Sequence, residues 1–190
     1  MTQTPDSRSP QPDASTLFAA IGLVWLLLFG IAVTGYPDLV DNERRVGAYV
    51  LDAVQNGSWA CQHDFTGAVA SKPPLLTWIA STVVMATGKL SRFAIYLPSA
   101  LGTLGVAFVI LSAGRKYFGW VAGFLGALAY LLSPTADIQV VTARYDGLFA
   151  FPVALAALAA FRSWQTGRGW IWFWLASAVA TMVKGPLGLI

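Results

Sequence analysis

The sequence predicts an all-α integral membrane protein, and three observations support this class. Charged residues make up only 11% of the chain, whereas soluble domains carry about 25%, and hydrophobic residues make up 56%. The segment 16–34 contains no Lys, Arg, Asp or Glu and is long enough to cross a bilayer as one helix. Eight Trp, eleven Phe and six Tyr residues are typical of a protein with aromatic belts at the membrane interfaces. We therefore expect membrane lipids to surround the helices.

The few charged and sulfur-containing residues exclude several classes of function. The net charge is +3 and its residues are scattered, so no basic stripe for a nucleic acid is present in the sequence. Cys61 is the single cysteine, which leaves no partner for an intrachain disulfide. With one Cys and one His, the sequence also does not support a structural zinc site.

The predicted elements begin with residues 1–15, which are polar and are expected to form a disordered cytoplasmic tail. The apolar run then forms a first transmembrane helix at about 16–35. A cleaved signal peptide is the alternative, but the tail lacks a basic n-region and the run is longer than a usual h-region. Further spans are predicted at about 93–113, 118–137, 147–164 and 169–190. Because the last segment stops without a polar tail, we expect 16–190 to be the N-terminal part of a longer membrane domain.

The topology depends on segment 73–88, which is uncharged but short for a span. If this segment lies in the interface, five basic residues are on the same side of the membrane as the N-terminal tail. If the segment crosses the membrane, four basic residues are on that side. The positive-inside rule then slightly favours the interfacial position, although the sequence leaves the choice open. Residues 36–92 become one extracytoplasmic loop with juxtamembrane helices, and Lys72, Arg144 and Asp146 face the same compartment as this loop.

Two acids, Asp41 and Glu43, stand near the start of this loop. Apolar residues recur at helical spacing between residues 42 and 55, which predicts an amphipathic helix at the membrane surface. In one interpretation the acids only cap this helix and favour its positive end. In the other, one of them is a general base, or helps to place a cation, at a phosphate-bearing substrate.

Each of three basic residues near apolar segments likewise has a structural and a functional interpretation. Arg144 and Asp146 form either an ordinary loop charge pair or a phosphate-binding arginine beside a second acid. Lys184 lies within an apolar stretch, where it either snorkels to the interface or meets an anion. Lys72 stands before two prolines, which is also typical of a simple helix start.

The order of these motifs resembles the GT-C type of polyprenyl-phosphate-sugar glycosyltransferase. More narrowly, the chain is similar to the bacterial relatives of protein O-mannosyltransferases and of lipid A aminoarabinose transferase, which are glycosyltransferase family 39-like. Seven stretches from about residue 35 to the end carry the resemblance: Asn42-Glu43-Arg44-Arg45, Gly57-Ser58-Trp59, Lys72-Pro73-Pro74-Leu75-Leu76-Thr77-Trp78, Arg92 with Leu97-Pro98-Ser99-Ala100, Ala113-Gly114-Arg115-Lys116-Tyr117-Phe118-Gly119, Thr142-Ala143-Arg144-Tyr145-Asp146 and Lys184-Gly185-Pro186.

The resemblance implies a GT-C-like helical bundle and an enzyme that transfers a hexosyl or pentosyl group from a polyprenyl-phosphate sugar donor to a lipid, glycan or protein acceptor. Inversion by direct displacement is implied, with a catalytic acid in the first loop. By position this acid is Asp41 or Glu43, while residues for donor or phosphate contact are Arg45, Lys72, Arg144, Asp146 and Lys184. We expect a multi-pass protein of the bacterial inner membrane whose site faces the periplasm or exterior, and we do not expect the fragment to be active by itself.

The chain departs from the family pattern at two positions. Asn42 stands where the family usually has Asp, so which of Asp41 and Glu43 is the base stays open. Ser71 replaces an acid that the family often has before the Lys-Pro pair and that is sometimes linked with metal binding. No metal ligand is therefore assigned, although a divalent metal remains an alternative, and His63 is interpreted as an ordinary loop residue. A membrane transporter or a noncatalytic membrane component is the rival function.

Overall fold

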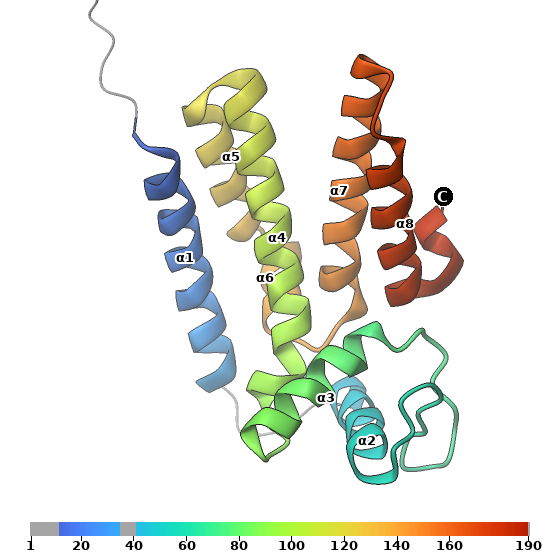
Figure 1. Cartoon of the computed structure of the whole chain (residues 1–190). Helices are drawn as coiled ribbons and strands as arrows, with labels where there is room; N and C mark the ends of the chain where they lie inside the picture. Colours follow the sequence, from blue (N-terminus) through green and yellow to red (C-terminus); the bar gives the residue numbers. More distant parts are fainter. Residues whose placement is uncertain (1–11, 35–40, 190) are drawn as a thin grey trace, which may run out of the picture.

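The computed structural model describes residues 12–34 and 41–189. This part of the chain folds into a bundle of long helices with two shorter helices and a loop at one end (Figure 1). Its elements are α1 (Ala14–Thr34), α2 (Asp41–Asn56), α3 (Leu75–Thr87), α4 (Arg92–Phe118), α5 (Trp120–Leu131), α6 (Pro134–Val140), α7 (Tyr145–Thr166), α8 (Trp170–Lys184) and the 3₁₀-helix η1 (Gly185–Leu189).

The predicted all-α membrane class is confirmed. Within the described residues there is no strand, and the nearest feature to one is an isolated bridge between His63 and Val69. Three described helices, α1, α4 and α7, are long and apolar enough to cross a membrane, or four spans result if α5 and α6 together count as one. Most of the predicted tail at 1–15 lies outside the described residues, because the structure does not describe residues 1–11. The predicted end of the first span, at residue 35, also lies outside them.

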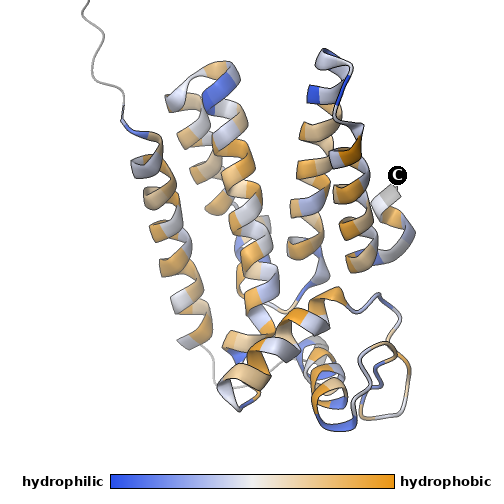
Figure 2. Ribbon diagram, viewed as in Figure 1, coloured by the Kyte–Doolittle hydropathy of each residue, from blue (hydrophilic) through white to orange (hydrophobic). Residues whose placement is uncertain are grey.

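The outer surfaces of the long helices are apolar, as expected for helices in contact with lipid. On α1 the side chains of Leu23, Leu27 and Ile31 are about 60–70% exposed. Figure 2 shows hydrophobic residues along all the long helices and more hydrophilic ones near α2 and at the opposite ends of α4 and α7. A bilayer is the solvent in which such apolar surfaces are stable.

Helix α4 is the centre of the bundle, because α1, α3, α5, α6 and α7 all pack against it. On α1, Ile21, Trp25 and Phe29 are buried, and the indole N–H of Trp25 donates to the carbonyl of Ala100 on α4 at 2.7 Å. Phe18 of α1 also meets Phe108 of α4 edge to face. Hydrogen bonds of this kind supplement packing in membranes, where helices gain no hydrophobic driving force from association.

Glycines allow α4 to approach its neighbours at backbone distance. A Cβ atom on Gly102 would lie 2.1 Å from the carbonyl oxygen of Gly147 on α7. A Cβ on Gly114 would lie 2.5 Å from the Cα of Gly123 on α5. Small residues at such crossings let membrane helices reach van der Waals contact along their backbones.

Two predicted spans differ from the structure. The span expected at 118–137 is broken after α5, and α6 follows at an angle of 63°. Ser133 caps α6 and Pro134 begins it, because proline fits a first helical turn but lacks the N–H that a continuing helix needs. The span expected at 169–190 is α-helical only to Lys184. Gly185 has a φ of +74°, and the chain continues as η1, which packs back on α8.

The helical segment predicted at 42–55 is present as α2, and segment 73–88 contains the 13-residue α3. Helix α3 is shorter than the helices that are candidate spans among the described residues. Figure 1 shows α2 and α3 beside each other at one end of the long helices. Whether α3 crosses the membrane stays a prediction.

Replacement of Gly102 by Ala should destabilise the bundle, since the new methyl group would collide with the backbone of α7. Overpacking of this kind costs about 1–3 kcal/mol. We expect a lower Tm for the purified protein in detergent. Gly22→Ala is the matched control, because nothing lies within 4 Å of a Cβ at that position on α1. Equal Tm values for the two variants would contradict the role of this crossing.

Candidate active site at the α2 end of the bundle

Helix α2 lies on the bundle through its apolar side. Val46, Val50 and Ala53 are buried, and they recur at the spacing of one helix face. Glu43 is also buried, at 2% exposure, and its Oε1 atom accepts a hydrogen bond of 2.7 Å from the Tyr96 hydroxyl on α4. This pairing, between residues 53 positions apart, fixes the first turn of α2 on the central helix.

The loop between α2 and α3 is tied to α2 by Asp52. Its Oδ2 atom accepts the backbone N–H of His63 at 2.8 Å and lies 3.1 Å from the Nδ1 atom of the same residue. The side chain of Asn56 donates to its Oδ1 atom. The hydrogen bond from Asn56, followed by the backbone N–H of His63, lowers the pKa of Asp52 to about 2. Asp52 is therefore a fixed acceptor that orders the loop.

The tip of the loop is held by Asp64, whose Oδ1 atom accepts from the backbone N–H and hydroxyl of Thr66 and from the N–H of Ala68. The hydroxyl of Thr66, then its N–H, lower the pKa of the Asp64 carboxyl. Arg45 of α2 lies 3.8 Å from its Oδ2 atom. The tip therefore positions one of the predicted phosphate-binding residues.

The loop returns to α3 through Gln62, which is buried although it is polar. Its amide nitrogen donates to the carbonyl of Trp59, and its Oε1 atom accepts from the Thr77 hydroxyl at 3.1 Å. The indole N–H of Trp78 on α3 donates to the same Trp59 carbonyl at 2.6 Å. Both ends of the loop are thereby anchored.

A pocket of about 330 Å³ opens between α2, the residues that precede α3 and the start of α7. Its volume is within the range of small-ligand sites, about 300–1,000 Å³. The residues that line it come from three separate parts of the sequence: Arg45, Val46, Tyr49, Ser71, Lys72, Ala143, Arg144, Tyr145 and Asp146.

Positive charge dominates this pocket. Arg45, Lys72 and Arg144 line it, and the carboxylate of Asp146 forms an ion pair with Lys184 from the end of α8. The ammonium of Lys72 lies 4.6 Å from the centre of the Tyr145 ring, so a cation–π contact holds it beside the pocket. The arrangement can bind an anion, with arginines suited to the oxygens of a phosphate.

The position of Arg144 follows from the contact between α4 and α7. Arg144 immediately precedes α7, and its carbonyl accepts a hydrogen bond from the Ser99 hydroxyl on α4. The N–H of Gly147, in the first turn of α7, donates to the Gln139 side chain at 3.0 Å. The backbone around Arg144 is therefore fixed while its side chain is exposed toward the pocket.

Four of the five residues predicted for phosphate or donor contact line this pocket: Arg45, Lys72, Arg144 and Asp146. The fifth, Lys184, reaches it through its ion pair with Asp146. Of the two predicted catalytic acids, Glu43 is not among the lining residues. Asp41 is the first residue of α2, and its side chain lies outside what the structure describes.

Sequence reasoning missed three tyrosines at the site. Tyr49 and Tyr145 line the pocket, and Tyr96 binds Glu43. Burial, followed by the charge of Asp64, raises the pKa of Tyr49, so its hydroxyl stays protonated and can donate to a ligand. Tyr145 lies between the predicted site residues Arg144 and Asp146, so the sequence could have identified it. No local sequence pattern indicates a role for Tyr96.

Among the His, Cys, Asp and Glu side chains that the structure describes, no group of three is arranged to hold a metal ion. His63, interpreted from the sequence as a loop residue, contacts Asp52 as part of the loop.

Fold and site together define an integral membrane protein with a pocket lined by basic side chains at the α2 end of the helical bundle. Residues 71–190 match the sequence profile described as dolichyl-phosphate-mannose-protein mannosyltransferase, and this chain belongs to that family. The predicted resemblance to GT-C type glycosyltransferases is thereby confirmed.

Similar proteins of known fold or name agree with this assignment. YycA of Bacillus subtilis (strain 168), which carries a provisional mannosyltransferase name, is 27% identical in an alignment of 165 residues that covers 83% of this chain and 23% of YycA. The apo crystal structure of ArnT from Cupriavidus metallidurans has a TM-score of 0.79 at 21% identity. ArnT bound to undecaprenyl phosphate has a TM-score of 0.75 at 22% identity. Both alignments cover 93% of this chain and 34% of ArnT, so the chain spans about a quarter to a third of these relatives.

Proposed function

We propose that the protein is a membrane glycosyltransferase that moves a hexosyl or pentosyl group from a polyprenyl-phosphate donor to a lipid, glycan or protein acceptor. The observation that carries this proposal is the convergence of Arg45, Lys72 and Arg144 on one pocket at the α2 end. Membership of a mannosyltransferase family supports the sugar transfer. The shared fold with ArnT, which was crystallised with undecaprenyl phosphate, supports a polyprenyl-phosphate donor.

In the proposed reaction an acceptor hydroxyl attacks the anomeric carbon of the donor sugar. A bond forms between the acceptor oxygen and that carbon, the bond from the carbon to the phosphate oxygen breaks, and the hydroxyl proton passes to a carboxylate. Negative charge develops on the departing polyprenyl phosphate, and the guanidinium groups of Arg45 and Arg144 and the ammonium of Lys72 stabilise it. A single displacement of this kind inverts the anomeric centre.

We assign the proton-accepting role to Asp41 and a positioning role to Glu43. The carboxylate of Glu43 is buried and accepts the hydrogen bond of Tyr96, which suits a residue that holds the first turn of α2 in place. Asp41 begins the same turn, two positions earlier. Asn42 between them has an amide side chain, which cannot serve as a base at neutral pH.

We further propose that the protein lies in the bacterial inner membrane with this pocket on the periplasmic or exterior side. Lys116 and Arg115 at the end of α4, and Arg162 and Arg168 around the end of α7, lie at the opposite end of the bundle from α2 (Figure 1). Basic residues in these short connections are expected on the cytoplasmic side.

Arg144→Ala should impair use of the donor, because it removes a charge-assisted contact to phosphate. Loss of such a contact costs about 1.5–3 kcal/mol, which corresponds to about a 10- to 100-fold lower kcat/KM for the donor. The measurement is radiolabelled sugar transfer from a polyprenyl-phosphate sugar by the protein in membranes. Arg115→Ala, at the other end of the bundle, is the control. An unchanged donor dependence in Arg144→Ala would rule out phosphate binding by this residue.

Asp41→Asn should lower kcat by about 10²–10⁴-fold, the usual contribution of a general base. Glu43→Gln keeps an oxygen that can accept the Tyr96 hydrogen bond, so its kcat should fall less than about tenfold, within what one neutral hydrogen bond contributes. Tyr96→Phe removes the same hydrogen bond, so its loss of kcat should be far smaller than that of Asp41→Asn if Glu43 acts through position. A larger loss of kcat in Glu43→Gln than in Asp41→Asn would show that Glu43 accepts the proton and that Asp41 has the positioning role.

Cys61 provides a test of orientation without a new cysteine, because it is exposed in the loop between α2 and α3. A membrane-impermeant maleimide added to intact spheroplasts should label the protein, and Cys61→Ser should abolish that label. Labelling of Cys61 only after the cells are opened would place the loop in the cytoplasm and refute the proposed orientation.

A further inference from the structure

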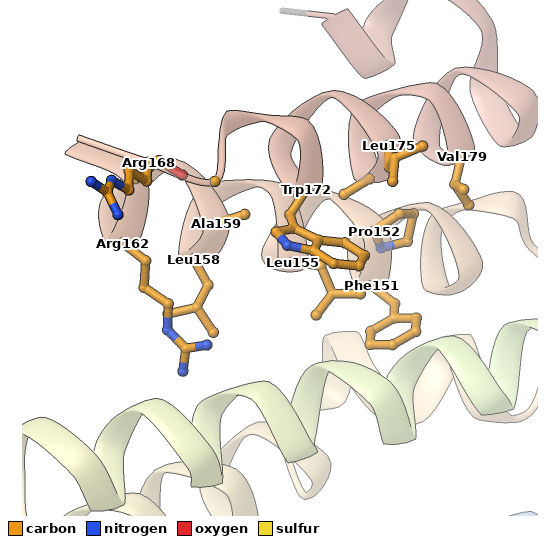
Figure 3. A pocket seen from close by; sticks show the side chains of 13 residues that line it. Phe151, Pro152, Leu155, Leu158, Ala159, Arg162, Arg168, Trp172, Leu175 and Val179 are labelled. Carbon is orange, nitrogen blue, oxygen red and sulfur yellow. The ribbon is translucent and has the colours of Figure 1, made fainter. Parts of the chain in front are cut away.

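A second cavity lies away from the α2 end, between α7 and α8. It measures about 560 Å³, and its walls are apolar except at one end (Figure 3). The side chains that form these walls are Phe151, Pro152, Leu155, Leu158, Ala159, Trp172, Leu175, Ala176 and Val179. We call this cavity the α7–α8 groove.

The α7–α8 groove has the length of one membrane leaflet. Phe151 and Arg162 both line it and are eleven positions apart on α7, which corresponds to about 16 Å of helix. Half of a hydrocarbon core of about 30 Å is about 15 Å. The apolar part of the groove therefore matches the depth to which one lipid acyl chain extends.

The polar end of the groove carries two arginines. Arg162 comes from the last turns of α7 and Arg168 from the turn before α8, and Figure 3 shows both at the end opposite Phe151 and Val179. Among the side chains that the structure describes, no carboxylate forms an ion pair with either guanidinium. Both groups can therefore contact an external anion.

Tryptophans place this end of the groove at the membrane interface. Trp164, Trp170 and Trp172 lie around the turn between α7 and α8, and their side chains are between 46% and 76% exposed. Exposed tryptophans of membrane helices gather at the level of the lipid headgroups. The two arginines are thus at headgroup depth, with the apolar walls directed into the hydrocarbon.

We propose that the α7–α8 groove binds an anionic glycerophospholipid, with one acyl chain along the groove and the phosphate between Arg162 and Arg168. Basic pockets between membrane helices are suited to anionic headgroups. A zwitterionic headgroup would bring its own cation to the same arginines, so the charge of the pair selects against it. The arginine end of the groove is at the opposite end of the bundle from the proposed active site, and this inference is independent of the sugar transfer.

Native mass spectrometry of the detergent-purified protein tests the proposal with phosphatidylglycerol and phosphatidylcholine of identical acyl chains. Two arginines at a membrane surface correspond to about a thirtyfold preference for the anionic lipid. Arg162→Gln combined with Arg168→Gln should remove this preference. Arg115→Gln combined with Lys116→Gln is the matched control, because it removes the same charge at the same end of the bundle but away from the groove.

Several results would overturn the proposal. Equal binding of the two lipids, or an equal loss in the control pair, would show that no specific site exists. Ala159→Trp should block the apolar part of the groove, and undiminished phosphatidylglycerol binding in this variant would place the lipid elsewhere. Preferential displacement by undecaprenyl phosphate, or crosslinking of Ala159→Cys to a polypeptide in membranes, would identify a different occupant.

Discussion

The backbone contact between α4 and α7 is the constraint on which the rest of the structure depends. Gly102 and Gly147 leave no space for a side chain between the two helices, so their crossing point is fixed. Beside it, the Ser99 hydroxyl holds the carbonyl of Arg144, which sets where α7 begins. Because α4 also carries α1, α3 and α5, this one crossing relates the membrane helices to the pocket. The same glycines that permit packing in lipid therefore determine the geometry of a charged site.

The pocket keeps several cations close together by giving each a different local partner. Arg45 lies near Asp64, Lys72 faces the Tyr145 ring, and Lys184 pairs with Asp146. Asp146 is the one carboxylate among the described lining residues, and it is paired with Lys184, so the net charge of the pocket is positive. Preorganised charges of this kind stabilise developing negative charge without a large rearrangement at the moment of reaction.

The fold class and the gathering of basic residues at one end of the bundle could be predicted from the sequence, but the burial of Glu43 could not. Apolar runs and motif order predicted the helices and brought Lys72, Arg144 and Asp146 together, because each lies next to a recognisable helix start. The burial of Glu43 depends on Tyr96, 53 positions away, and no local pattern reports such a contact. The bend before α6 likewise depends on how far the chain can turn at Pro134, which hydropathy alone does not measure.

The hydrogen-bonded loop between α2 and α3 has a consequence for the thermodynamics of ligand binding. Asp52, Gln62 and Asp64 each accept or donate several internal hydrogen bonds, so the loop has one ordered arrangement before any substrate arrives. Ordering a flexible residue costs about 1–2 kcal/mol of backbone conformational entropy, and a loop already ordered does not incur that cost on association. Ligands that meet this surface should therefore bind with a smaller entropic penalty and without a slow folding step.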